Sequence, residues 1–169
     1  MGNGLTFSHD LLGQEELQAG ITRLSDQVAA RLRRYRMKCN GVSLAIRDPS
    51  FRDINRQQRL DSPSNLAREI SQAAMGLAES CWNMDHPVRA LTVTAISLVP
   101  EEEAAAQLDL LALDQGRKRE RLEKLEETMD SIRAKYGRAS ISHASSAQAA
   151  GGSGHAPPPG GSRSYLEEE

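Results

Sequence analysis

Aromatic side chains are scarce in this sequence. Its 169 residues include one tryptophan, three tyrosines and two phenylalanines. A core built from such a sequence must be aliphatic, and platforms for stacking nucleic-acid bases are few. Phe51 and Trp82 are expected in the core. The length allows one domain of ordinary size with tails.

Cysteine and histidine are also sparse and widely separated. Cys39 and Cys81 have no paired spacing, which excludes a disulfide framework and a cysteine metal box. The sequence therefore predicts no metal site and no cofactor in this chain, and it favours a reducing, cytoplasmic setting. The histidines form no candidate metal or catalytic cluster, because they lie at His9, His86, His143 and His155.

Long apolar runs are missing as well. No stretch approaches the ~20 apolar residues that are needed to span a membrane. The first residues lack the basic-then-apolar layout of a signal peptide. We therefore expect a cytoplasmic protein with no membrane partner.

Charge is unevenly distributed, although the net charge is only −2. Acids predominate from Glu101 onward. Basic residues predominate between positions 23 and 68, which predicts a surface for a polyanion on one part of the molecule. The alternative is that these side chains form only a solvated helix face. The basic residues concerned are Arg23, Arg31, Arg33, Arg34, Arg36, Lys38, Arg47, Arg52, Arg56, Arg59 and Arg68.

Two helices are predicted in the first hundred residues. Apolar residues recur at steps of three and four over residues 17–35, and Asn40 and Gly41 provide a stop signal for that helix. A second helix is expected to open at residues 62–64 and to continue to Cys81.

Alternating apolar and β-branched residues predict four strands, at residues 5–8, 42–47, 51–60 and 88–98. The element order is strand, helix, strand, strand, helix, strand (βαββαβ). This order predicts an α+β fold of the ferredoxin-like type, with a four-stranded antiparallel sheet and two helices on one face. Strict alternation places Ile54 and Leu60 on the same face as Arg56 and Gln58, which requires a bulge or different strand limits.

A third helix is predicted from Asp114, where apolar residues repeat at helical spacing as far as Tyr136. From Ala144 the chain is rich in Ala, Ser, Gly and Pro, which predicts a disordered tail. The expected organisation is a domain at residues 2–100, a linker at 101–113, a helix with a short extension at 114–143, and a disordered tail at 144–169.

The predicted linker contains a recognisable pentapeptide. It resembles the short peptide with which bacterial replication proteins bind the sliding clamp, in which apolar side chains fill pockets and a glutamine amide contacts the rim. A leucine-rich start to an amphipathic helix has a similar pattern. The residues are Gln107, Leu108, Asp109, Leu110 and Leu111.

Several segments, taken in order, resemble the little-finger domain of Y-family DNA polymerases, specifically the DNA polymerase IV group. The run His86-Pro87-Val88-Arg89-Ala90-Leu91 is similar to the family's Pro-Val-Arg-Leu-Leu-Gly strand. The resemblance covers roughly residues 2–143. Its other segments are residues 2–7 with 10–11 for the first strand, 51–60 for the third-strand signature, 107–111 for the clamp peptide, and 129–137 for the closing helix.

The resemblance implies a sheet that contacts primer-template duplex DNA, without sequence preference, through phosphates. The face opposite the helices is expected to carry Ser43, Ala45, Arg47, Thr92 and Thr94. The expected DNA-binding residues are Arg47, Arg56, Gln57, Gln58, Arg59, Arg89, Thr92 and Thr94. Arg89 has an alternative role as an ion-pair partner of Asp85.

The sequence departs from the family pattern at several positions. Asn55 and Gln57 replace the usual Thr and Ser around Arg56, and Leu111 replaces the terminal Phe of the clamp peptide. Many members carry a basic residue where this chain has Ala45 and Thr94, and a glycine where it has Thr92. These changes bear on the strength of DNA and clamp contacts.

The resemblance further implies that the catalytic part of the polymerase, with its magnesium ions, lies outside this chain, so the chain by itself is not expected to be an enzyme. The expected partners are primer-template DNA, the sliding clamp and the remainder of the polymerase. The main alternative is a clamp- or protein-interaction module without DNA binding. A single-stranded nucleic-acid module would need strand aromatics, and a small-molecule domain would need a phosphate-binding loop.

Overall fold

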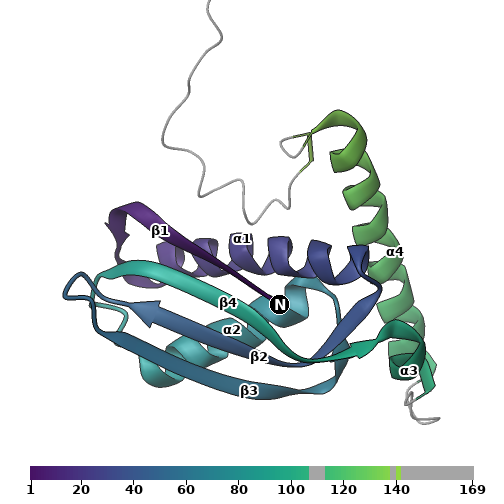
Figure 1. Cartoon of the computed structure of the whole chain (residues 1–169), viewed down its shortest axis with the longest axis horizontal. Helices are drawn as coiled ribbons and strands as arrows, with labels where there is room; N and C mark the ends of the chain where they lie inside the picture. Colours follow the sequence, from purple (N-terminus) through teal and green to yellow (C-terminus); the bar gives the residue numbers. More distant parts are fainter. Residues whose placement is uncertain (107–112, 138–139, 142–169) are drawn as a thin grey trace, which may run out of the picture.

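The computed structural model describes residues 1–106, 113–137 and 140–141. Within these ranges the elements follow the predicted order, including the helix predicted from Asp114, and one short helix, α3, was not predicted (Figure 1). They are β1 (Gly2–Leu11), α1 (Gly13–Arg34), β2 (Met37–Arg47), β3 (Asp53–Ser64), α2 (Ala67–Cys81), β4 (Val88–Pro100), α3 (Glu101–Ala106) and α4 (Leu113–Tyr136).

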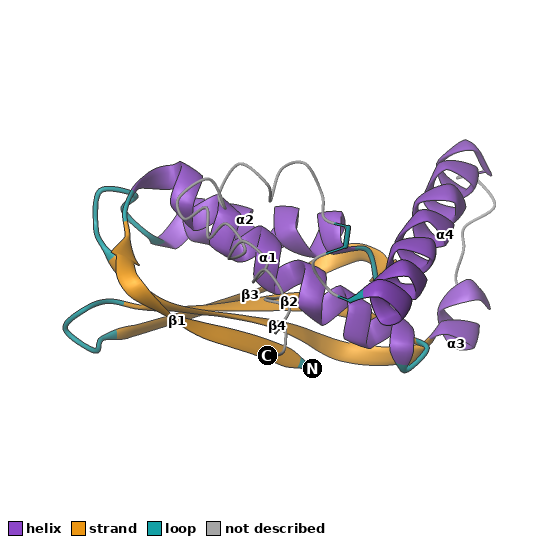
Figure 2. Cartoon of the chain, turned by 90° about the horizontal axis from the view of Figure 1, so that it is seen from above, coloured by secondary structure: helices purple, strands orange, loops and turns teal. Residues whose placement is uncertain are grey.

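The described strands form one antiparallel four-stranded sheet in the order β1-β4-β2-β3. Helices α1 and α2 lie on one face of this sheet, and no described helix covers the other face (Figure 2). We call the uncovered side the open face. The predicted α+β class, with βαββαβ order and two helices on one face, is confirmed.

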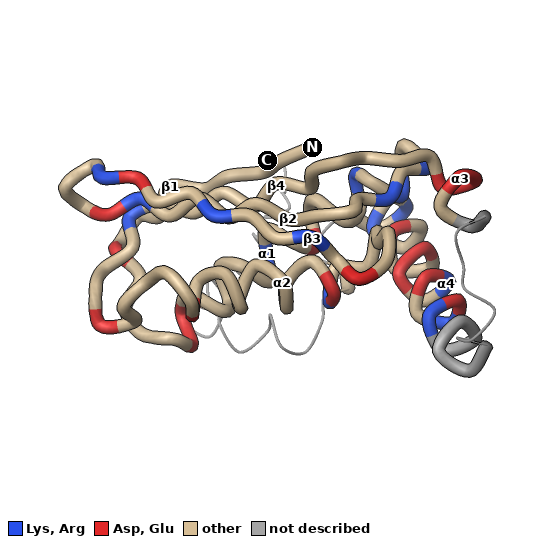
Figure 3. The backbone as a smooth tube through the Cα atoms, turned by 90° about the horizontal axis from the view of Figure 1, so that it is seen from below, with Lys and Arg blue, Asp and Glu red and all other residues tan. Residues whose placement is uncertain are grey.

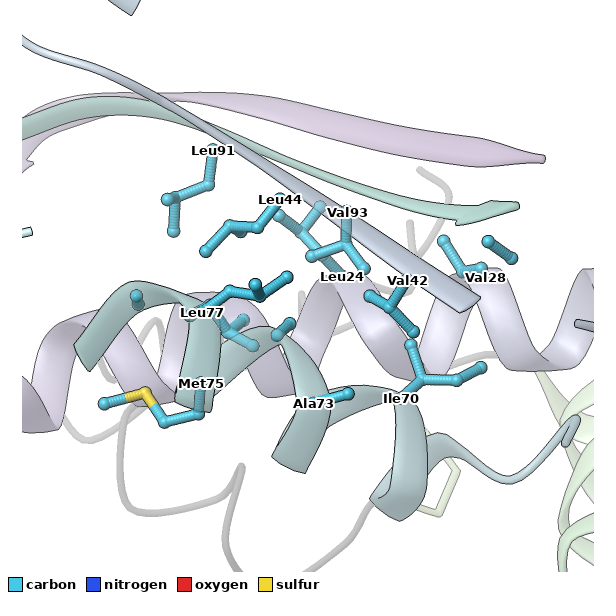
Figure 4. Close-up of a cluster of buried hydrophobic side chains, with 14 of the residues drawn as sticks. Leu24, Val28, Val42, Leu44, Ile70, Ala73, Met75, Leu77, Leu91 and Val93 are labelled. Atoms are coloured by element: carbon cyan, nitrogen blue, oxygen red, sulfur yellow. The ribbon is translucent and has the colours of Figure 1, made fainter. Parts of the chain in front are cut away.

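The core lies between the sheet and the two helices and is aliphatic, as the scarcity of aromatics predicts (Figure 4). Val42, Leu44 and Ile46 on β2 are almost fully buried, and so are Leu91 and Val93 on β4. Their alternation with polar neighbours places every second side chain of each strand against the helices. Burial of this apolar surface is the main stabilising contribution to the fold.

The connection between α1 and β2 differs from the prediction. The helix ends at Arg34, and Arg36 turns the chain with a left-handed φ of 52°. Asn40 and Gly41 lie inside β2, next to a shift in the β2–β3 register between Cys39 and Gly41. A Cβ atom at Gly41 would lie 2.8 Å from the Gln58 carbonyl oxygen. Glycine is therefore used here for close strand packing and not for ending a helix.

The start of α2 also differs. Residues 62–64, expected to open the helix, belong to the end of β3, and α2 begins at Ala67. The Ser64 hydroxyl accepts the backbone N–H of Leu66 at 3.1 Å and so orders the connection before the helix. The N-cap residue of α2 is Leu66, whose side chain makes no capping hydrogen bond.

The two aromatic residues expected in the core have different environments. Phe51 is wrongly predicted, because it lies in the β2–β3 turn with a φ of 62° and is 77% exposed. Turn geometry overrides its apolar character. Trp82 packs partly buried against the core, and its indole N–H donates to the His86 carbonyl oxygen at 3.2 Å.

The C-terminal helix α4 packs against the domain through a polar seam. Arg33 of α1 forms ion pairs with Glu126 and, at 2.7 Å, with Asp130. Lys38 of β2 pairs with Glu123 at 2.8 Å. Acidic and basic residues alternate along α4, whereas β1, β2 and β4 carry few charges in their middle parts (Figure 3). Within α4, Arg119 pairs with Glu123 at 3.8 Å and Lys124 with Glu120 at 2.8 Å.

The predicted linker is helical in its first part. Residues 101–106, expected in an extended linker, form the short helix α3. Residues 107–112 of the linker and the whole predicted tail, 144–169, lie outside the described residues, and Leu113 already belongs to α4. Among the helices of the described ranges, none is both long and apolar enough to cross a membrane.

Candidate nucleic-acid interface

Strand pairing defines which side chains share the open face. Val42, Leu44 and Ile46 point to the helices, so the residues between them point outward. Ser43 lies opposite Gln57 on β3 and Thr94 on β4. The paired residues of the four strands that share this side of the sheet are the registered positions of the open face. They are Gly2, Gly4, Thr6, Gly41, Ser43, Ala45, Arg47, Asp53, Asn55, Gln57, Arg59, Ala90, Thr92, Thr94 and Ile96.

Small side chains line the middle of the open face. Gly4 faces Thr92 across β1 and β4, and a Cβ atom at Gly4 would lie 2.5 Å from the Thr92 hydroxyl oxygen. Gly2 has the same relationship to Thr94. The threonine hydroxyls therefore lie over the glycine backbone. A large ligand can approach this low surface closely and meet hydroxyl groups there.

Charge on the open face is concentrated on the β2–β3 hairpin. Arg47 donates from Nε and Nη2 to the two carboxylate oxygens of Asp53, at 2.7 and 2.8 Å. The hydrogen bond with Arg47 lowers the pKa of the Asp53 carboxyl and raises that of the guanidinium, so both groups stay charged. The pair lies on the surface, with side-chain exposures of 48% and 53%.

Arg59 is the second arginine of the open face. It lies opposite Gly41, and its side chain is exposed. Within the part of the chain that the structure describes, its guanidinium has no ion-pair partner. Arg59 is therefore available to a polyanion, whereas Arg47 is already engaged by Asp53.

The expected placement of Ser43, Ala45, Arg47, Thr92 and Thr94 opposite the helices is confirmed by the register. Two more of the expected DNA-binding residues, Gln57 and Arg59, share this face.

Three expected DNA-binding residues lie elsewhere. Arg56 and Gln58 pair with the inward-facing Leu44 and Val42, so they extend toward the helical side of the β3 edge. Gln58 donates to the Ala73 carbonyl oxygen of α2 at 3.2 Å. Arg89 pairs with Asp10 at 3.4 Å and not with Asp85. Ile54, Arg56 and Gln58 thus lie on the same side of β3, as strict alternation predicts. The shift in the β2–β3 register lies between Cys39 and Gly41.

Sequence reasoning missed part of the open face, including two polar residues of β3. Asp53 and Asn55 lie on β3 beside Gln57, and Asn55 accepts a hydrogen bond from the Ser43 hydroxyl at 2.8 Å. The signal was available, because these residues alternate with Ile54.

The clamp-like peptide, Gln107 to Leu111, lies outside the described residues. Helix α3 ends immediately before it, at Ala106, and α4 begins at Leu113. Among the described residues, no group of three or more His, Cys, Asp or Glu side chains is placed to hold a metal ion.

Comparison with known proteins identifies the class. Residues 1–110 match the impB/mucB/samB family C-terminal domain, and the chain belongs to this family. The sequence is similar to DNA polymerase IV of Acetivibrio thermocellus, with 36% identity over 141 residues, and to DNA polymerase IV 1 of Bacillus subtilis, with 33% identity over 137 residues. The resemblance to the little-finger domain of the DNA polymerase IV group is confirmed.

The matches cover 83% and 81% of this chain but 35% and 32% of the two polymerases. The chain thus spans about a third of the length of these curated relatives. A solved structure, a complex of the beta-clamp processivity factor and the little finger domain of PolIV, is similar with 16% identity and a TM-score of 0.46. It covers 59% of this chain and 85% of that one.

Proposed function

We propose that this chain is the duplex-gripping domain of a translesion DNA polymerase and that the open face is its DNA surface. The observation that carries the proposal is the composition of that face. Its low middle consists of glycine, alanine, serine and threonine, and arginines lie along the adjacent β2–β3 hairpin. Such a surface fits a phosphate backbone and offers no shaped pocket for a base.

The chemistry of this contact is electrostatic and independent of sequence. Arg47 and Arg59 each neutralise a phosphate, while the Thr92 and Thr94 hydroxyls donate to phosphate oxygens. Each neutralised phosphate contributes a slope of ~0.9 in log affinity against log salt concentration. A domain with few such contacts binds weakly alone and serves to hold a duplex beside a catalytic centre.

Catalysis lies outside this proposal for the chain. The match covers only 35% of the first of these polymerases, and we assign nucleotide transfer, with its magnesium ions, to the remainder of such a protein. The chain itself would need no cofactor to contact DNA. Its setting would be the cytoplasm, where the duplex partner is found.

Direct binding measurements test the proposal. Fluorescence anisotropy of a labelled primer-template should show salt-sensitive binding, and the double substitution Arg47→Ala, Arg59→Ala should weaken it at least tenfold at low salt. The log–log slope should fall by ~1.8, since two phosphate contacts are lost.

Arg23→Ala is the matched control, because it removes the same charge from an exposed position of α1 in the helical layer. Equal binding by the double variant and the wild type would rule out the open face. Arg56→Ala, Gln58→Ala and Arg89→Ala, measured alongside, show whether the predicted residues away from this face also contribute.

A second function is proposed for residues 107–111, which resemble a clamp-binding peptide. Glutamine at the start and leucines after it supply the rim contact and the pocket-filling side chains of such a peptide. Tethering to a ring on the duplex would raise the local concentration of a weakly binding domain. If duplex binding is absent and clamp binding is present, the chain is an interaction module only.

A further inference from the structure

We propose that Asp53 is a built-in counter-charge that holds Arg47 in the free protein and is replaced by a DNA phosphate on binding. This inference rests on the proposed duplex-binding function of the open face. It assigns a ligand-exchange step to one ion pair and a specific role to an acid on a surface that is otherwise suited to a polyanion.

The geometry supports exchange because the pair is already a two-point contact. Arg47 and Asp53 lie directly opposite each other on β2 and β3, and two nitrogens of Arg47 bind the two oxygens of Asp53. A phosphodiester also presents two oxygens to a guanidinium, and arginine binds both groups in the same forked manner. Asp53 therefore occupies the donors that a phosphate would use.

The surroundings make the exchange possible. About half of each side chain is exposed, so water can solvate Asp53 when the pair opens. The hydrogen bond from Arg47 lowers the pKa of Asp53, so the carboxylate is charged near neutral pH and competes fully with phosphate. An exposed pair of this kind contributes little to folding and can open without disturbing the core.

Asp53 also lowers the net positive charge of the open face. Among the registered open-face positions, the charged residues are Arg47, Arg59 and Asp53. One negative charge against two positive ones leaves a net charge of one. Removing Asp53 doubles that charge and frees Arg47, so affinity and salt dependence should increase together.

Two other roles give opposite results. If Asp53 orients Arg47 toward DNA and stays bound to it, loss of the carboxylate should weaken binding. If the pair only joins the two strands of the hairpin, loss should leave binding unchanged and lower stability slightly. Only the exchange predicts that loss of the Asp53 carboxylate raises DNA affinity and that this increase requires Arg47.

The test is a double-mutant cycle on the whole chain, with duplex affinity measured by anisotropy across salt concentrations. We expect Asp53→Asn to bind about three- to tenfold more tightly at low salt, with a log–log slope steeper by ~0.9. The gain should vanish in Arg47→Ala. Asp61→Asn is the control, because it removes the same charge from an exposed position of β3 that has no described arginine partner.

Thermal unfolding of every variant checks that the fold is intact. Unchanged or weaker binding by Asp53→Asn overturns the exchange, as does a gain that persists without Arg47 or that Asp61→Asn reproduces. These results leave the proposed function standing when the wild type binds duplex. If neither the wild type nor Asp53→Asn binds duplex at low salt, the proposed function itself fails.

Discussion

The carboxylate of Glu126 on α4 accepts the backbone N–H of Ala67, the first residue of α2, at 3.1 and 3.2 Å from its two oxygens. The N–H groups of a first helical turn have no partner inside their own helix. Glu126 supplies one from a distant element and also pairs with Arg33 on α1. One buried side chain thus joins three helices, and α4 is a structural part of the domain.

We predict that Glu126→Gln lowers the free energy of unfolding by about 2–3 kcal/mol, because Arg33 is almost buried and loses a charged partner. Urea denaturation measures the change. Glu127→Gln is the matched control, since its exposed neighbouring position should change stability by less than about 0.5 kcal/mol. Equal stability of the two variants would show that α4 does not support the domain.

The open face should respond to charge at its centre. Ala45 lies on β2 between Asn55 and Thr92 and points away from the helices. We predict that Ala45→Lys tightens duplex binding about three- to tenfold at low salt, while Ala45→Glu weakens it at least tenfold. The difference should shrink at high salt, because counter-ions screen exposed charges. Identical affinities would place the duplex elsewhere.

Stability should depend on one buried thiol at alkaline pH. Burial raises the pKa of Cys39 from its ordinary value of 9.0 to about 11, and the thiol donates to the Ser64 carbonyl oxygen at 3.3 Å. The folded pKa lies above the unfolded one, so its contribution is fully present below about pH 9 and is lost as pH rises to about 11.

Over that interval the wild type should therefore lose roughly 2–3 kcal/mol more than Cys39→Ser, whose hydroxyl does not titrate. Urea unfolding at a series of pH values measures both slopes. Parallel slopes would show that the Cys39 thiol ionises equally well in the folded protein.

The clamp-like peptide gives a prediction that is independent of DNA. Replacing Gln107 and Leu108 by Ala should abolish binding to an immobilised bacterial sliding clamp and leave duplex affinity unchanged. Wild-type affinity should be micromolar, ~8 kcal/mol or less, because a short peptide must be ordered on binding. Glu102→Ala is the control, because it lies outside the peptide and should bind normally.

Leu111→Phe should bind the clamp several-fold more tightly, since a phenyl ring fills an anchor pocket better by about 1 kcal/mol. Surface plasmon resonance measures all of these variants. Equal capture of the wild type and the Gln107, Leu108 double variant would identify the segment as the leucine-rich beginning of a helix.

The sequence by itself determined the fold class and the character of the sheet faces. The alternation of Val42, Leu44 and Ile46 with small and polar residues assigned each side chain of β2 correctly. The helical stripe from Leu17 onward did the same for α1. Both patterns follow from geometry within one element, where strand and helix periods dictate which residues face the core.

Only the tertiary structure decided which strand residues meet and where the last helix lies. The pairing of β2 with β3 separated Arg56 and Gln58 from the open face and placed Asp53 on Arg47. Docking of α4 joined Arg33 to Asp130, which are 97 positions apart. Such contacts depend on register and on packing between distant segments, and local periodicity carries no information about either.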